Sequence, residues 1–435
     1  MAQLAPNSLV LRRFAYLRSA VVYGVQEVSE RGVVASVLPL FLGLALLMVG
    51  NGLLGSLLGL RADLEGFPTV VIGVVMSLYY VGFLLGSLTI PRRLVTVGHI
   101  RVFAGLTALA SAAALSYSLL VAPFAWGFLR FVFGLAMSGL YVTAESWLNE
   151  RASNETRGRL LSVYMLVVTF GLGFGQFLLG IDDPLNATLF IVVGILISLA
   201  VVPVALIRIP VPSETIPVKF SIAALVRVAP LGVVAVVLSG FADGAIVALG
   251  AVYATGVGME PGLVGAFMAA AIIGGAASQY PLGYLSDRFP RRRIVLVVAA
   301  GAVVVATVAA ALDATGPWLF VLAAVYGSLA FPMYSLAVSM INDVMPPNQL
   351  VAAAAGIIFI YAIGSIVGPI AVSVLMQIVG PVGYFWGLAV AFVPLVIYAL
   401  ARIIFTARPK QRRFINLPHR SSTAAAMLAE PSEEG

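Results

Sequence analysis

Residues 283–293 read Gly-Tyr-Leu-Ser-Asp-Arg-Phe-Pro-Arg-Arg-Arg, which places a glycine, an acid and a basic cluster between two long apolar runs. Residues 262–282 before this stretch and 294–312 after it carry no charge. Each run has about the ~20 residues that a helix needs to cross the hydrocarbon core of a bilayer. The stretch therefore predicts a tight charged turn between two membrane helices, with its four arginines on the cytoplasmic side.

The composition extends this prediction to the whole chain. Of 435 residues, 61% are hydrophobic and 10% are charged, whereas soluble domains carry about 25% charged residues. We therefore expect an all-α integral membrane protein. Uncharged or nearly uncharged stretches predict twelve helices near residues 37–60, 69–91, 101–122, 124–147, 160–180, 186–207, 230–254, 262–283, 294–312, 317–340, 352–378 and 382–404.

The basic residues indicate how these helices cross the membrane. If both termini are cytoplasmic, only Arg61 and Arg130 of the 25 Lys and Arg residues lie away from the cytoplasmic side. The net charge of +7 is then a topology signal, and it does not indicate nucleic-acid binding. We expect a multi-pass protein of the plasma (inner) membrane. Charges interrupt residues 1–36, which favours a cytoplasmic or interfacial segment rather than a signal peptide, and residues 405–435 have the composition of a disordered cytoplasmic tail.

The chain contains an internal repeat. At an offset of 192 or 193 residues, many residues of the first half fall on identical residues of the second. The first-half members of these matches are Gly73, Met76, Gly82, Arg101, Gly134, Tyr141, Ala144, Asn149, Gly171 and Gly175. The repeat predicts two parallel six-helix bundles, residues 37–208 and 226–404, joined by a cytoplasmic linker at 209–225.

The charged turn resembles the loop signature of the major facilitator superfamily, although Pro290 stands where that signature has its second glycine. An ordinary positive-inside loop without a gating role is the alternative. Three further strings are similar to the YcaD-like branch of this superfamily: Gly52-Leu53-Leu54-Gly55 with Leu60-Arg61-Ala62, Gly98-His99-Ile100-Arg101-Val102-Phe103, and Glu145-Ser146-Trp147-Leu148-Asn149. The resemblance implies the major facilitator fold and transport by alternating access between the two halves.

Three charged residues inside predicted spans are candidates for substrate or proton coupling, because charge at membrane depth is costly. Arg130 opens the run Arg-Phe-Val-Phe-Gly, which resembles the family's fourth-helix arginine motif; snorkelling to the interface is the alternative. Glu145 lies about 22 Å further along the same helix and is a proton acceptor, half of a gate pair or a structural bridge. Asp243 is the only acid of the seventh span, where it either takes up a proton or bonds to backbone beside Gly240 and Gly244.

The charges at the cytoplasmic helix ends suggest a gate. Glu150 and Asp343 end equivalent predicted helices, and Arg101 and Arg293 begin the neighbouring ones. We therefore expect two symmetric pairs, Arg101 with Glu150 and Arg293 with Asp343. The loop motif itself contributes Gly283, Asp287, Arg288 and Arg291.

Glycines and polar groups complete the set of candidates. Gly171, Gly175, Gly364 and Gly368 predict close helix packing, and they resemble a glycine motif associated with antiporters in this superfamily. Polar groups on the predicted spans are candidates for a substrate cavity, or else they bond to one another between helices: Asn51, Tyr79, Tyr80, Tyr141, Tyr164, Gln176, Tyr253, Gln279, Tyr334, Tyr361 and Gln377.

Together these observations predict a secondary transporter of a small neutral or amphipathic organic solute, proton-coupled, with efflux as one candidate direction. A passive facilitator and a transporter-like sensor or assembly factor are the alternatives. We do not expect an enzyme, because the chain has only two histidines, His99 and His419, no cysteine, and no phosphate-binding glycine loop. We expect no cofactor and no metal, a monomer in the bilayer, and a small molecule and protons as partners.

Overall fold

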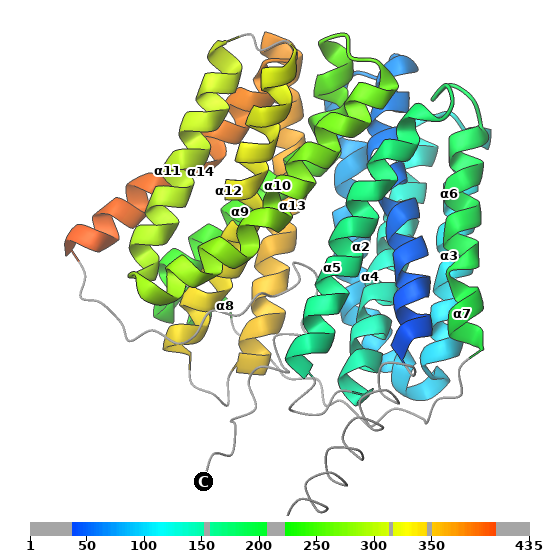
Figure 1. The fold of residues 1–435 in the computed structure, drawn as a ribbon, viewed down its shortest axis with the longest axis horizontal. Coiled ribbons are helices and arrows are strands. Elements are labelled where there is room, and N and C mark those ends of the chain that lie inside the picture. Colours follow the sequence, from blue (N-terminus) through cyan, green and yellow to red (C-terminus); the bar gives the residue numbers. More distant parts are fainter. Residues whose placement is uncertain (1–36, 152–156, 207–221, 313–315, 346–349, 406–435) are drawn as a thin grey trace, which may run out of the picture.

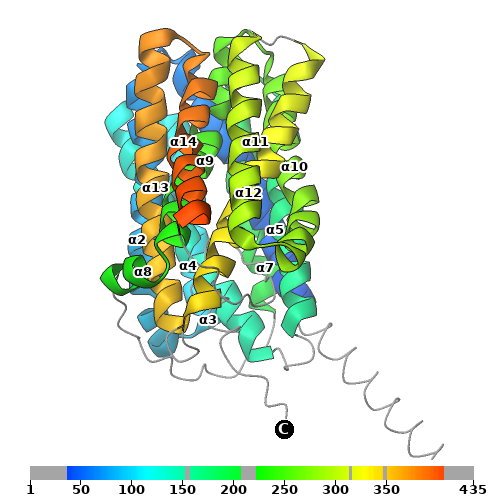
Figure 2. The same cartoon turned by 90° about the vertical axis from the view of Figure 1, so that its left-hand side faces the viewer.

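The structure is a computed structural model that describes residues 37–151, 157–206, 222–312, 316–345 and 350–405. Within these ranges, twelve helices are long and apolar enough to cross a membrane, and they run side by side in two groups (Figures 1 and 2). The prediction of an all-α membrane protein with twelve spans is confirmed. The predicted terminal segment 1–36 lies outside the described residues, as do all but the first residue of the predicted tail 405–435 and most of the predicted linker.

The first half begins with the span Val37–Leu64 and ends with α6, which continues into the short α7. Its labelled helices are α2 (Thr69–Val97), α3 (His99–Leu119), α4 (Pro123–Arg151), α5 (Arg157–Phe177), the 3-10 turn η1 (Leu178–Gly180), α6 (Thr188–Leu199) and α7 (Val201–Ala205). The second half consists of α8 (Ile222–Val228), α9 (Pro230–Gly256), α10 (Pro261–Arg288), α11 (Arg291–Ala311), α12 (Pro317–Val344), α13 (Leu350–Val379) and α14 (Gly383–Phe405).

The charged stretch 283–293 is mostly helical, which corrects the prediction of a loop. Gly283 to Arg288 form the last turns of α10, and α11 starts at Arg291. Phe289 is extended (φ −114°, ψ 157°) because the ring of Pro290 disfavours helical geometry in the residue before it. The equivalent turn of the first half uses Gly98 at φ +89°, a left-handed conformation that glycine adopts without steric cost.

Close helix contacts repeat between the halves at equivalent positions. A Cβ atom added at Gly134 of α4 would collide with the carbonyl oxygen of Tyr79 in α2. At the repeat-equivalent Gly327 of α12, it would collide with the carbonyl oxygen of Ala271 in α10. Small residues let helix backbones approach in this way, so the sequence repeat corresponds to a repeat of packing geometry.

The four glycines predicted to pack helices lie in two further contacts of this type. A Cβ atom at Gly171 or Gly175 of α5 would collide with the first span, at the Met48 side chain and the Val49 carbonyl oxygen respectively. In the second half, α13 packs on α9 at equivalent places, with Gly364 against Val237 and Gly368 against Phe241.

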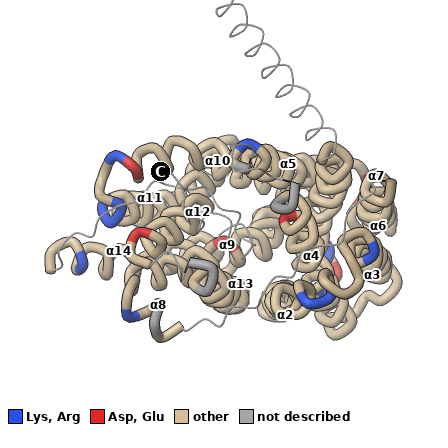
Figure 3. Tube along the Cα trace, turned by 90° about the horizontal axis from the view of Figure 1, so that it is seen from below, with Lys and Arg blue, Asp and Glu red and all other residues tan. Residues whose placement is uncertain are grey.

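The two halves contact each other mainly at one end of the molecule, opposite the turns at Gly98 and Phe289–Pro290. We call the end with the turns at Gly98 and Phe289–Pro290 the basic end, where Lys and Arg segments lie around both halves (Figure 3). At the opposite end α2 packs on α13, and α5 and η1 pack on α10. The Thr69 amide donates to Gln377 Oε1 at 3.1 Å there, and nearby the Ser77 hydroxyl donates to the Ile366 carbonyl at 2.9 Å.

Candidate transport cavity

A cavity of about 590 Å³ lies between the two halves. Ser162 of α5 and Gly283, Tyr284 and Asp287 of α10 line it near the basic end. Towards the opposite end α5 and α10 are in direct contact, with Gly265 against the carbonyl of Gln176. The arrangement is therefore closed at the opposite end and extends towards the basic end.

Arg130 lies in the wall of this cavity and is 4% exposed. Its guanidinium carbon lies 5.0 Å from the centre of the Tyr79 ring, a cation–π geometry that partly offsets the cost of burying the charge. The Tyr117 hydroxyl is also beside it. The side chain lies about two turns into α4 and is buried in the cavity wall, which favours a role in the cavity over snorkelling to the interface.

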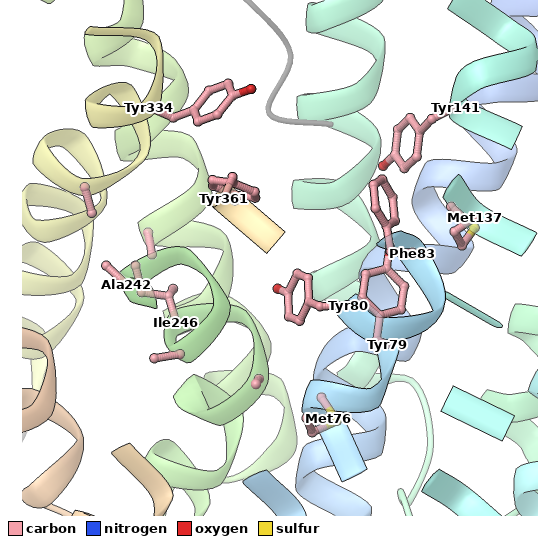
Figure 4. Close-up of a cluster of buried hydrophobic side chains, with 14 of the residues drawn as sticks. Met76, Tyr79, Tyr80, Phe83, Met137, Tyr141, Ala242, Ile246, Tyr334 and Tyr361 are labelled. Carbon is pink, nitrogen blue, oxygen red and sulfur yellow. The ribbon is translucent and has the colours of Figure 1, made fainter. Parts of the chain in front are cut away.

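Asp243 faces the same cavity from α9 and is 2% exposed. The Tyr361 hydroxyl donates to its Oδ2 at 3.1 Å, and the Tyr361 ring contacts Tyr334 edge-on with centroids 4.9 Å apart. In Figure 4, the Tyr80 hydroxyl of the first half points towards the side on which Tyr361 and Tyr334 of the second half lie. Asp243 is thus bonded to a side chain of α13, and its role as a proton acceptor or as a residue bonded to backbone beside Gly240 and Gly244 stays a prediction.

Glu145 is completely buried, but it lies behind the cavity wall and not in it. The Tyr164 hydroxyl donates to its Oε1 at 2.7 Å, and Tyr164 itself lines the cavity. Tyr334 of the other half lies within electrostatic reach of Glu145. A solute in the cavity would meet Tyr164 before the carboxylate of Glu145.

Three further predicted residues, Asn51, Tyr141 and Gln176, line the cavity. The Gln176 amide nitrogen donates to the Gly52 carbonyl at 2.9 Å, and its oxygen accepts from the Ser56 hydroxyl. The Tyr141 hydroxyl lies 3.0 Å from the sulfur of Met48. Gln176 thus ties α5 to the first span, which is the interhelical alternative, while it also presents a face to the cavity.

At the basic end, Asp343 pairs with Arg291 and not with the predicted Arg293. Arg291 Nε lies 2.9 Å from Asp343 Oδ2, and Arg291 Nη2 lies 3.3 Å from Asp287 Oδ1. Arg293 is exposed, so the predicted pair of Arg293 with Asp343 is wrong. The reason is helical phase, because two residues at about 100° each turn Arg293 roughly 200° away from the face of Arg291.

In the first half His99, the repeat equivalent of Arg291, occupies the corresponding place. Its Nε2 lies 3.0 Å from the Ser146 hydroxyl, and its ring centre lies 6.1 Å from that of Trp147. Arg101 is exposed. The side chain of Glu150 lies outside the described residues, so the pair of Arg101 with Glu150 stays a prediction.

Two tyrosines of α10, Tyr280 and Tyr284, line the cavity although sequence reasoning did not select them. They lie four residues apart and continue the helical face of Gln279 and Gly283, a spacing that could have identified them. Conversely, Tyr253 packs against Phe267, Tyr384 and Phe385 and does not line the cavity. Gln377 lies in the seam at the opposite end instead.

Comparison with known proteins agrees with this architecture. The family model described as Major Facilitator Superfamily matches residues 231–429, and the model described as Sugar (and other) transporter matches residues 19–212. The uncharacterized MFS-type transporter YcaD of Salmonella arizonae is 30% identical over 345 residues, which are 78% of this chain and 88% of that protein. The chain belongs to the major facilitator superfamily. The YcaD protein of Salmonella typhi is 29% identical over 348 residues, 78% of this chain and 89% of that protein.

Solved transporters of this superfamily share the fold of the chain. The nucleoside transporter NupG aligns with a TM-score of 0.71 at 14% identity, covering 84% of this chain and 98% of that one. A bacterial homolog of the human lysosomal transporter Spinster, in an inward-facing and unoccupied conformation, aligns with a TM-score of 0.65 at 13% identity over 92% and 99% of the two chains. The E. coli fucose:proton symporter FucP aligns with a TM-score of 0.52 at 15% identity, covering 85% of this chain and 99% of that one.

Proposed function

We propose that this protein is a secondary active transporter that moves a small neutral or amphipathic organic solute by alternating access, driven by protons. The observation that carries the proposal is the cavity between the halves, which extends towards one end of the bundle and is closed at the other. Its walls are mostly apolar and aromatic, with a few polar groups that could orient a solute. We infer that the basic end is cytoplasmic, because loops rich in Lys and Arg stay on that side.

We assign proton coupling to Asp243, because this carboxylate faces the solute cavity directly while Glu145 lies behind Tyr164. A carboxylate at membrane depth is costly and marks a proton or ion pathway by default. The hydroxyl of Tyr361 stabilises the charged form of Asp243, so protonation would weaken a bond between α9 and α13. Through this bond a proton on Asp243 acts on the packing of the two helices. Glu145 then serves as a structural anchor for Tyr164.

The first experiment identifies a ligand. Purified protein is heated with a library of metabolites, lipids and lipophilic drugs at about pH 5.5 and pH 8, since a ligand bound to the folded state raises stability by RT ln(1 + [L]/Kd). A stabilising compound is then tested for flux in proteoliposomes.

The second experiment tests the coupling. A gradient of one pH unit supports up to about tenfold accumulation, or depletion in an exchanger, per coupled proton, because one unit corresponds to about 1.4 kcal/mol. We expect wild-type protein to reach an accumulation or depletion of this size. In Asp243→Asn the solute ratio should fall to about onefold, while solute exchange continues. Glu145→Gln is the matched control and should keep the coupling. Wild-type flux without any pH dependence would establish a passive facilitator, and unchanged coupling in Asp243→Asn would overturn the assignment of Asp243.

A further inference from the structure

The cavity has an open side between α5 and α10. The two helices are in contact from the opposite end as far as Gly173, which lies beside Ile272 and Ile273 near the middle of α10. From there towards the basic end they diverge, as Figure 1 shows. Below the contact both helices line the cavity, α5 with residues 162–170 and α10 with residues 275–287. We call the seam between residues 162–170 and 276–284 the portal.

The portal side chains lie at the edge of the cavity, where it meets the outer surface. Tyr280 is 82% exposed, Phe170 67% and Leu166 55%, although all three line the cavity. Tyr280 lies about 12 Å from the basic end of α10, at ~1.5 Å per residue, which is within the hydrocarbon layer of a helix of this length. An opening at that depth meets lipid tails rather than water.

The other seam between the halves differs. There α2 contributes Met76, Tyr79 and Tyr80 from its first half, and α13 contributes Tyr361 from near its middle. None of the lining residues comes from the basic-end turns of these two helices, among the residues that the structure describes. The cavity therefore extends along α5 and α10 specifically.

Inside the cavity, Arg130 is a buried cation that can receive an anion. Among the residues that the structure describes, no carboxylate lies within salt-bridge distance of its guanidinium. The Tyr79 ring offers only partial compensation, and buried charges are normally paired. At the outer edge, Arg288 stacks on Tyr284 at 4.2 Å, which places a second positive charge where lipid head groups lie.

The geometry points to a membrane-dissolved amphipath as the solute, with one hydrocarbon chain and an acidic head group. Its head binds Arg130, and its chain lies along Phe170, Leu166 and Tyr280 and leaves through the portal into the leaflet of the basic end. The volume of about 590 Å³ is in the range of pockets that hold drug-sized molecules. This inference rests on the proposed transport function and narrows its substrate class.

Photocrosslinking tests the inference on the full chain in lipid nanodiscs. The probe is palmitic acid with a diazirine in its tail, and the matched neutral probe is monopalmitoylglycerol with the same tail. We expect the acidic probe to label Phe170 and Tyr280 at least about tenfold more than Val297 of α11 or Val390 of α14, since binding at a site exceeds lipid contact. Val297 and Val390 are 66% and 61% exposed, so they control for exposure.

Two sets of variants distinguish binding of the acidic head group at Arg130 from binding of the hydrocarbon chain in the portal. Arg130→Gln should lower portal labelling by the acidic probe about tenfold or more, as expected for loss of a charge-assisted hydrogen bond, and leave the neutral probe unchanged. Arg130→Lys keeps the charge and controls for folding. Ala276→Trp should fill the portal and reduce labelling by both probes, whereas Ala277→Trp, one residue away and outside the cavity wall, should not.

Labelling spread evenly over Val297, Val390 and the portal, or equal labelling by acidic probe in wild type and Arg130→Gln, would overturn the inference. These outcomes are independent of the transport function. If the protein carries a water-soluble solute and the portal is not labelled, the inferred amphipathic substrate is wrong, whereas the proposed transport function is supported. If the portal is labelled and no flux is found under any pH gradient, the binding site stands and the transport function fails.

Discussion

The two halves of this protein place different chemistry on the same backbone arrangement at the basic end. In the second half Arg291 is buried between the carboxylates of Asp287 and Asp343. In the first half His99 occupies the equivalent position and contacts the hydroxyl of Ser146 and the ring of Trp147, and Val95 stands where the second half has Asp287. A common fold thus carries a charged contact in one bundle and a largely neutral one in the other.

The two halves share their helix-packing contacts but differ in the charges that they bury at the basic end. The glycine contacts between helices recur in both halves, so they are a property of the repeat. The buried ion pair is confined, among the described residues, to the second half. Burying two charges is expensive, and a buried pair does not by itself stabilise a fold more than apolar packing would. The Arg291 cluster joins α10, α11 and α12 within the second half, and the repeat of helix packing does not require it.

The largest effect is expected at Asp343. Asp343→Asn removes the closer carboxylate from the buried guanidinium of Arg291, and breaking a buried pair costs about 3–5 kcal/mol. Chemical unfolding in mixed micelles measures the loss. The control is Arg293→Gln, an exposed change on the same helix that should stay within about 0.5 kcal/mol. If Asp343→Asn lowers the free energy of unfolding by less than about 1 kcal/mol, the pair of Arg291 and Asp343 contributes no more than a solvent-screened surface pair.

Substitution of the equivalent glycines should lower the free energy of unfolding by an intermediate amount, equal in the two halves. Gly134→Ala and Gly327→Ala each push a methyl group into a backbone carbonyl of the neighbouring helix, and overpacking of this kind costs about 1–3 kcal/mol. Gly105→Ala of α3 is the control, because a Cβ atom there meets open space and alanine favours the helix by up to about 1 kcal/mol. A large loss in one half alone would show that the packing symmetry is only apparent.

The smallest effect is expected at the first-half contact. Ser146→Ala removes the hydroxyl that lies 3.0 Å from His99, and a neutral hydrogen bond contributes about 1 kcal/mol. The same unfolding assay compares it with Ser116→Ala, whose exposed hydroxyl bonds only within its own helix turn. A loss as large as that of Asp343→Asn would mean that His99 carries a charge, and the contrast between the halves would disappear.

Much of the fold was predictable from the sequence because a bilayer imposes strong conditions. Twelve uncharged stretches of sufficient length indicate twelve spans, since every backbone polar group in lipid must bond within a helix. The offset of 192–193 residues indicates two parallel halves. Arg130 and Asp243 stood out for the same reason, because charge at that depth is costly wherever it occurs. These conclusions depend on local composition and need no knowledge of which helices touch.

The contacts between helices were decided only by the tertiary structure. The sequence placed Arg291 and Arg293 in one basic cluster, but the start of α11 sets which of them faces Asp343. Glu145 and Asp243 look alike as isolated acids, yet one lies behind Tyr164 and the other in the cavity wall. The portal depends on the divergence of α5 and α10, two helices about a hundred residues apart. Hydropathy reports how deeply a residue lies in the membrane, whereas side-chain direction and helix neighbours depend on how the helices pack.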